Sequence, residues 1–171
     1  MDILVFSDSH GRTEKIKEAI ARQIKKPDAI IFLGDGLRDM QNIDTNGIPL
    51  LCVRGNCDIG SMFSNDAPDE QCIILGDKRM LFTHGHRYGV KTTLLSIIRE
   101  AITRKADIVL YGHTHEGYER ELGGDNEYGL KLEKPLYIMN PGSIGSYPYM
   151  FGTITIDKKG RVILSHGTLE K

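Results

Sequence analysis

The chain has 171 residues, of which 40% are hydrophobic and 26% are charged, and its net charge is −1 at pH 7. This length and composition are typical of a globular protein with a buried core, and we expect one domain over residues 1–171. The balanced charge and the lack of a basic, aromatic-rich stretch argue against extended nucleic-acid binding. The longest early apolar run, residues 3–6, is too short for a signal peptide or a membrane span, so we expect a cytoplasmic protein without membrane contact.

The first half of the chain alternates between short β-branched runs and helical patterns. These patterns predict strands at residues 3–7, 29–33 and 50–54, and helices at residues 13–26 and 37–43. The first helix is predicted to bury Ile16, Ala19, Ile20 and Ile24 on one face.

The second half is predicted to be richer in strands. Residues 71–75 and 80–83 are expected to form a hairpin, and residues 90–104 a helix that buries Val90, Leu94, Leu95, Ile98 and Ile102. Further strands are predicted at residues 108–111, 136–139, 150–156 and 162–165, and the Gly-rich, charged residues 117–134 are expected to form an exposed hairpin or flap. The order of elements indicates an α/β fold with an antiparallel part towards the C-terminus.

Five of the six histidines fall in three short clusters. The clusters are Asp8-Ser9-His10, His84-Gly85-His86 and His113-Thr114-His115. Imidazole and carboxylate groups are the usual protein ligands of divalent transition metals. The clustering therefore indicates a metal site, whereas the three cysteines form no CxxC pair and argue against a zinc finger.

Polar ligand groups follow five of the predicted strands. Asp8, Asp35, Asn56, His84 and His113 each lie within about two residues of a predicted strand end. Ligands of α/β proteins bind beyond the carboxyl ends of the strands, where the following loops meet. We therefore expect these five side chains to converge at one edge of the structure.

Each motif also has an ordinary explanation when it is considered alone. Asp8-x-His10 could be a helix cap beside a surface histidine, and Gly34-Asp35 could be a simple turn. His84-Gly85-His86 is as compatible with a structural role as with a site. The joint occurrence of all the motifs, in order and at strand ends, favours the metal site.

The ordered motifs DxH, GD, GN(H/C)D, H and GHxH resemble those of the calcineurin-like metallophosphoesterase superfamily, over residues 3–144. The small size and Gly55-Asn56-Cys57-Asp58 are most similar to the small YfcE-like phosphodiesterase branch. The resemblance implies an α/β fold of two facing mixed β-sheets flanked by helices, an αββα sandwich.

The resemblance also implies a binuclear centre. One divalent ion would be held by Asp8, His10, Asp35 and His115, and a second by Asp35, Asn56, His84 and His113, with Asp35 shared. Mixed nitrogen and oxygen ligation suits Mn²⁺, Fe²⁺, Ni²⁺, Co²⁺ or Zn²⁺, and the resemblance favours manganese.

These ligands predict a metal-dependent phosphoesterase acting on a small phosphate ester. A hydroxide bridging two ions about 3.5–4 Å apart would attack the phosphorus, with Asp35, Asn56 and His84 holding the catalytic ions. A preference for phosphodiesters rests on the resemblance alone.

Cys57 departs from the pattern of many relatives, which carry a histidine thought to protonate the leaving oxygen. A thiol with a pKa of about 8.5 is a poorer acid at neutral pH. Cys57 is then a structural residue, with water or His86 as the acid, or the acid is missing. His86 lies outside the implied ligand set, and three roles stay open for it: support of a ligand, contact with the substrate, and a structural role.

A different class of function is a non-catalytic metal-binding scaffold of the same fold that acts through protein–protein contacts. The seven intact ligands favour the enzyme. Residues 117–134 and the aromatic stretch at 147–149 are expected to form the outer wall of the pocket, although these tyrosines could instead mark a subunit contact in a homo-oligomer.

Overall fold

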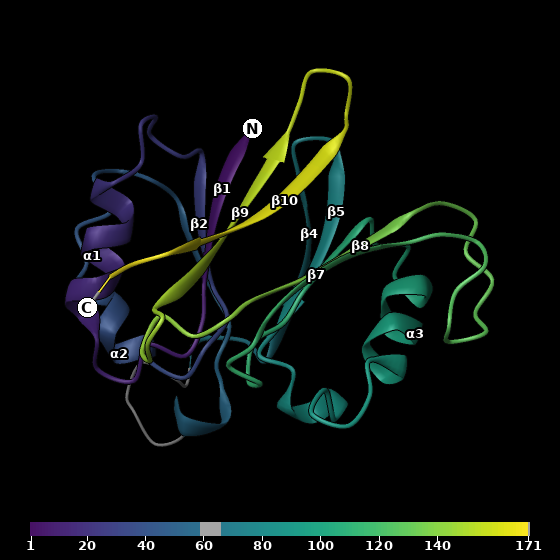
Figure 1. Cartoon of the computed structure of the whole chain (residues 1–171), viewed down its shortest axis with the longest axis horizontal. Coiled ribbons are helices and arrows are strands. Elements are labelled where there is room, and N and C mark those ends of the chain that lie inside the picture. Colours follow the sequence, from purple (N-terminus) through teal and green to yellow (C-terminus); the bar gives the residue numbers. More distant parts are fainter. Residues whose placement is uncertain (59–65, 171) are drawn as a thin grey trace.

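The computed structural model describes residues 1–58 and 66–170, and two facing β-sheets form its centre (Figure 1). The first sheet contains β1 (Asp2–Phe6), β2 (Ala29–Phe32), β3 (Leu50–Cys52), β9 (Met150–Ile156) and β10 (Val162–Thr168), in the order β10-β9-β1-β2-β3. The second contains β4 (Glu70–Leu75), β5 (Lys78–Thr83), β6 (Ile108–Leu110), β7 (Gly117–Leu122) and β8 (Leu136–Pro141), in the order β4-β5-β6-β8-β7.

Three α-helices cover the outer faces of the two sheets. Helices α1 (Thr13–Ala21) and α2 (Leu37–Met40) lie beside the first sheet, and α3 (Leu95–Thr103) lies beside the second (Figure 1). Two short 3₁₀ helices, η1 (Asn56–Asp58) and η2 (His86–Tyr88), follow β3 and β5. The predicted αββα sandwich of two mixed sheets is confirmed.

Side-chain alternation in β1 explains how a strand serves two cores. Ile3 and Val5 point into the cluster between the sheets, and Leu4 and Phe6 point into the cluster beneath α1 and α2. Both sets are buried, because successive side chains of a strand leave opposite faces of the sheet. Residues 3–6 are all apolar, without alternation of polar and apolar side chains, because both faces of this strand are covered.

The strand directions bring the loops of interest to one edge. In the first sheet β1 pairs with β2, and β2 with β3, in parallel. In the second sheet β5 pairs with β6 in parallel. Each parallel set therefore presents its carboxyl ends together, and the loops that follow these five strands meet between the sheets.

The helix predicted over residues 13–26 is wrong at its C-terminal end. Helix α1 stops at Ala21, and Ile24, which we expected on the buried face, is completely exposed. The chain must turn here to enter β2, and the N–H of Asp28 donates to the carbonyl of Asp2. Pro27 also disfavours helical geometry at the residue before it.

The helix predicted over residues 90–104 is wrong at its N-terminal end. Helix α3 begins at Leu95, because the N–H groups of Thr92 and Thr93 donate to the carbonyl of Gly89 and form turns. Ile97 takes a fully buried position in the core, and Ile102, which we expected to be buried, is 38% exposed.

The hairpin predicted from the Gly-rich residues 117–134 is present in part. Strand β7 pairs antiparallel with β8 at the edge of the second sheet, and residues 123–135 connect the two strands. The other predicted hairpin, β4 with β5, is confirmed. Within the described ranges, no helix is long and apolar enough to cross a membrane.

Candidate metal centre

Loops from both sheets bring the seven predicted ligands together. The loops after β1, β2 and β3 carry ligands from the first sheet, and the loops after β5 and β6 carry ligands from the second. The loop after β1 carries Asp8 and His10, the loop after β2 carries Asp35, and the loop after β3 carries Asn56. The loop after β5 carries His84, and the loop after β6 carries His113 and His115. The candidate centre therefore lies where the two sheets face each other, and no single loop could build it.

Backbone conformation distinguishes these loops from the rest of the chain. Eight non-glycine residues have positive φ within the described ranges, and five of them are predicted ligands. Their φ values are 56° for Asp8, 44° for His10, 56° for Asp35, 68° for His113 and 62° for His115. Left-handed backbone is unfavourable for such residues and concentrates at functional sites, where the surrounding structure enforces it.

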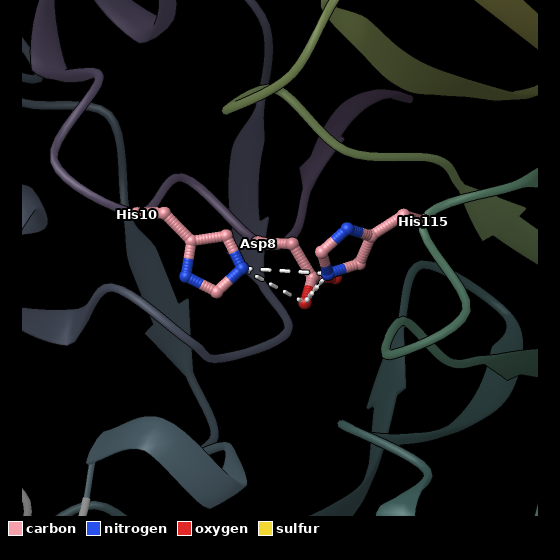
Figure 2. A group of neighbouring side chains, drawn as sticks. All are labelled: Asp8, His10 and His115. Atoms are coloured by element: carbon pink, nitrogen blue, oxygen red, sulfur yellow. Dashed lines mark hydrogen bonds and ion pairs between the residues drawn. The ribbon is translucent and has the colours of Figure 1, made fainter.

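The first ligand group consists of Asp8, His10 and His115 (Figure 2). The Nε2 atom of His115 lies 3.0 Å from Oδ1 of Asp8 and 3.3 Å from Nε2 of His10. The Nε2 atom of His10 lies 3.8 Å from the same carboxylate oxygen. Figure 2 shows the two imidazoles approaching Asp8 from opposite sides, one from each sheet's loops.

Asp8 is fully buried, and its two oxygens have different surroundings. Oδ2 accepts hydrogen bonds from the Ser7 hydroxyl at 2.5 Å and from the His113 N–H at 3.1 Å. Oδ1 is buried and accepts no hydrogen bond from the described residues, although it faces the histidine nitrogens. A buried carboxylate oxygen without a hydrogen bond is unfavourable, so this atom is suited to bind a cation together with the histidine nitrogens.

The second group consists of Asp35, Asn56, His84 and His113. The Nε2 atom of His84 lies 3.1 Å from Oδ1 of Asn56, 3.2 Å from Nδ1 of His113 and 3.4 Å from Oδ2 of Asp35. Asp35 also lies within 4.8 Å of the ligand atom of His10, which belongs to the first group. Asp35 therefore stands between the two groups.

A hydrogen bond between its Nδ1 atom and a backbone carbonyl fixes the orientation of His84. Its Nδ1 atom lies 2.8 Å from the carbonyl oxygen of Leu33, which can only accept, so Nδ1 carries a proton. Nε2 consequently faces the other ligands and is the atom available to a metal. Burial lowers the pKa of His84, but Asp35 and Asp8 outweigh it and raise that pKa.

The charge of Asp35 is stabilised within the centre. Burial disfavours its carboxylate, yet interactions with His84 and with the N–H of Cys57 hold the pKa of Asp35 well below its usual range. The Cys57 N–H donates to Oδ1 of Asp35 at 2.7 Å. Asp35 is therefore ionised at neutral pH, as a metal ligand must be.

Asp58 supports the loops of the second group. Its carboxylate accepts hydrogen bonds from the backbone N–H groups of Asp35, Gly36, Leu37 and Gly55, at 2.8–2.9 Å. The structure shows that this one carboxylate joins the loops after β2 and β3.

Two further residues support the ligand loops, although the sequence analysis assigned neither of them a role. Asp39 accepts hydrogen bonds from the Ser9 hydroxyl and the Gly11 N–H beside His10. Asn140 donates to the carbonyl of Gly112 and to the Thr114 hydroxyl beside His113. Both side chains are buried.

Glycine is required where the loops approach most closely. A Cβ added at Gly55 would lie 2.1 Å from Oδ1 of Asp35, and one at Gly112 would lie 1.9 Å from the Ser7 hydroxyl oxygen. Both distances are far below van der Waals contact. Any side chain at either position would displace a ligand or its hydrogen-bond partner.

Cys57 and His86 lie at the border of the centre. The Cys57 sulfur is within 4.8 Å of ligand atoms of His10 and Asp35. Burial and the neighbouring acids raise the pKa of the Cys57 thiol to about 11. The His86 ring centroid lies 5.4 Å from that of His84, and burial, then the charges of His84 and Arg87, lower the pKa of His86.

The donor set fits divalent ions. Ligand atoms held at about 2.0–2.2 Å from one ion lie roughly 3–4 Å from each other, which is the spacing of both groups. The donors are imidazole nitrogens with carboxylate and amide oxygens, and the buried Oδ1 of Asp8 lacks a hydrogen bond. Together with the two facing sheets, this metal-binding geometry is the one expected of a metallophosphoesterase-like protein.

Comparison with known proteins identifies the family. Residues 1–159 match the calcineurin-like phosphoesterase superfamily domain, and the chain belongs to this family. It is 34% identical to the probable metallophosphoesterase YsnB of Bacillus subtilis (strain 168), over 84% of this chain and 75% of that protein. It is 25% identical to the phosphodiesterase YfcE of Escherichia coli (strain K12), over 92% of this chain and 89% of that protein.

A solved structure with this fold is vacuolar protein sorting 29 from Cryptosporidium parvum. The TM-score is 0.71 and the identity is 14%, over 99% of this chain and 98% of that chain. The family match and the two bacterial relatives confirm the resemblance to the calcineurin-like superfamily and its YfcE-like branch. Family membership supports a metal-dependent phosphoesterase.

Proposed function

We propose that this protein hydrolyses phosphodiesters with the help of two divalent metal ions, of which Mn²⁺ is the preferred species. The observation that carries the proposal is the position of Asp35 between two ligand groups that otherwise share no residue. Asp8, His10, Asp35 and His115 would hold one ion, and Asp35, Asn56, His84 and His113 the other.

When bound, the two ions supply a hydroxide nucleophile at neutral pH and Lewis-acid stabilisation of charge on the phosphoryl oxygens. The protein keeps Asp8 and Asp35 as the two carboxylates of the ligand set. Four positive charges therefore exceed two negative ones, and the loaded centre attracts an anionic ester. The sheets exclude water from behind the centre, because Asp8 and His84 are completely buried.

The residues at the border favour esters with good leaving groups. Cys57 stays a thiol at neutral pH, since its pKa is raised to about 11, and such a thiol is a weak acid. His86 is neutral at this pH because its pKa is lowered, so it also delivers few protons. We infer that the leaving oxygen departs without strong acid assistance from this chain.

A scaffold function is the second candidate, and the fold shared with vacuolar protein sorting 29 is the observation that favours it. The likeness concerns the fold alone, at 14% identity. A scaffold would keep its protein partner when Asp35 is changed, whereas an enzyme would lose its activity.

The deciding experiment measures hydrolysis of bis(4-nitrophenyl) phosphate and 4-nitrophenyl phosphate by chelator-stripped protein, before and after Mn²⁺ is added. We expect Mn²⁺ to restore turnover, with the diester preferred. Asp35→Asn should lower diester turnover by at least about 10³-fold, since both ions share this ligand. Asp125→Asn, which changes an exposed acid in the β7–β8 connection, is the matched control.

Metal binding without turnover of either ester would contradict the enzymatic proposal and favour the scaffold. Absence of metal binding by folded protein would contradict both the binuclear centre and the hydrolysis.

A further inference from the structure

A cavity of about 660 Å³ adjoins the loop after β6, which is the loop that carries His113 and His115. We call it the tyrosine groove, and its polar and aromatic lining includes Lys91, Thr93, Thr114, Glu116, Tyr118 and Tyr128. These residues come from the turns before α3, from the loop after β6, and from β7 with the connection that follows it. Its volume is within the range of small-molecule sites, about 300–1,000 Å³.

The groove adjoins the metal ligands through the loop after β6. Thr114 lines the groove and stands between His113 and His115 in the chain. Its hydroxyl accepts a hydrogen bond from Nδ2 of Asn140 at 3.0 Å, which holds the loop in place. A molecule in the groove therefore contacts the same loop that presents two ligands to the ions.

Lys91 gives the groove a positive charge. Lys91 is exposed and lines the groove. An anionic ester at the centre would therefore also be attracted by this cation.

Aromatic rings form a prearranged wall of the groove. Tyr118 and Tyr128 are half-buried and pack against the apolar cluster beneath α3. The ring of Tyr118 lies 6.5 Å from that of the buried Tyr111, at an interplanar angle of 52°. Tyr118 and Tyr128 line the same groove, and burial, together with the phenol of Tyr118, raises the pKa of Tyr128. Such rings present flat surfaces with little loss of conformational freedom.

We propose that the tyrosine groove binds an aromatic ring carried by an ester group of the substrate. The protein would then select phosphate esters of ring-bearing alcohols over esters of small alkyl alcohols. This inference rests on the proposed function, because the phosphoryl group is placed at the metal ions. Hydroxyl groups of Thr93 and Thr114, and the charges of Lys91 and Glu116, would orient polar substituents of the ring.

The test measures binding of phosphonates, whose P–C bond is not an ester bond, to Mn²⁺-loaded protein by calorimetry. Phenyl-, benzyl- and phenethylphosphonate are compared with methyl-, ethyl- and propylphosphonate, so that the linker length is sampled. We expect the best aryl compound to bind about tenfold more tightly than its alkyl counterpart. This factor corresponds to the upper range of the free energy of one aromatic contact.

Matched variants separate the ring contact from other causes. Tyr118→Leu and Tyr128→Leu should each reduce the aryl preference to about threefold or less, and Tyr118→Phe should keep it, because the ring stays. Tyr137→Leu is the control: it alters a half-buried tyrosine of β8 in the same sheet that does not line the groove.

Equal binding of aryl and alkyl compounds would overturn the inference, as would an aryl preference that survives both leucine variants. Loss of binding by all phosphonates, including the alkyl ones, would also overturn it. Aryl-selective binding without hydrolysis of any diester would leave the groove standing and refute the proposed function. Hydrolysis of the diester without a preference for aryl compounds would support the proposed function and refute the inference about the groove.

Discussion

The two ligand groups of the candidate centre differ in how the protein holds them. The histidines of the first group are open to solvent, with side chains 37% exposed at His10 and 42% exposed at His115. In the second group the His84 side chain is fully buried and that of Asp35 is 4% exposed. The two histidines of the first group therefore lie at the surface, whereas His84 and Asp35 of the second group lie in the core.

Support by hydrogen bonds follows the same division. His84 is anchored to the carbonyl of Leu33, and Asp58 holds the backbone at Asp35. His10 and His115 contact each other and Asp8 (Figure 2). A ligand that is already in place loses less conformational freedom when an ion binds. We therefore expect the second group to bind its ion first and more tightly.

The largest effect should come from removing one histidine of each group. His84→Ala should abolish the tighter of two Mn²⁺ binding events, a loss of about 100-fold or more in affinity, because supporting contacts alone account for 10–100-fold. His115→Ala should weaken only the looser event. Calorimetric titration of chelator-stripped protein measures both, and equal losses in the two variants would contradict the proposed difference.

Substitutions of the two carboxylates that support the ligand loops test the same comparison through the stability of the protein. Asp58→Asn replaces an acceptor of backbone N–H groups by an amide with one acceptor, and should lower the free energy of unfolding by about 2–4 kcal/mol. Asp39→Asn, beside the first group, loses fewer such bonds and should cost about 1–2 kcal/mol. Urea denaturation of metal-free protein gives both values, and a larger loss for Asp39→Asn would reverse the ranking.

Cys57→Ser should have a small effect on catalysis. The thiol is protonated at neutral pH and is a weak acid, so turnover of bis(4-nitrophenyl) phosphate should stay within about threefold of the unmodified protein. Steady-state kinetics with metal analysis of the same sample checks this. A collapse of turnover at full metal content would assign Cys57 a direct role in the reaction.

The smallest effect concerns the reactivity of the same thiol. The pKa of Cys57 is raised to about 11 from 9.0, so at pH 9 its thiolate is rare in the folded protein and common in the unfolded one. Alkylation of metal-free protein by iodoacetamide at pH 9 should therefore accelerate in urea, as measured for the Cys57 peptide by mass spectrometry. An equal rate in folded and unfolded protein would show that the environment of Cys57 does not suppress the thiolate.

The two segments expected to form the outer wall of the pocket lie in different parts of the structure. Residues Gly117, Tyr118 and Tyr128, from the predicted flap, line the tyrosine groove. Tyr149 instead packs against the apolar cluster beneath α1, where Lys15 lies over its ring. Both segments carry aromatic residues beside glycine or proline in the sequence. Their separation depends on which sheet each segment joins, which local composition does not encode.

The sequence by itself determined the chemistry of the centre. The types of ligand, their order and their positions after strands could be read directly, because strand ends in parallel sheets share one edge and metals require imidazole and carboxylate groups. The limits of α1 and α3 could not, since a long-range hydrogen bond from Asp28 to Asp2 and turn hydrogen bonds to Gly89 overrode the helical spacing.

The tertiary structure alone decided how the ligands are held. The positive φ angles at Asp8, Asp35 and His113 persist because the packing of two sheets and the carboxylate of Asp58 over-determine the loops. The burial of His84 and the exposure of His115 likewise depend on contacts between residues far apart in the chain. The identity of the residues determined which ions the centre can bind. Long-range packing determined how rigidly each ligand group is held before an ion binds.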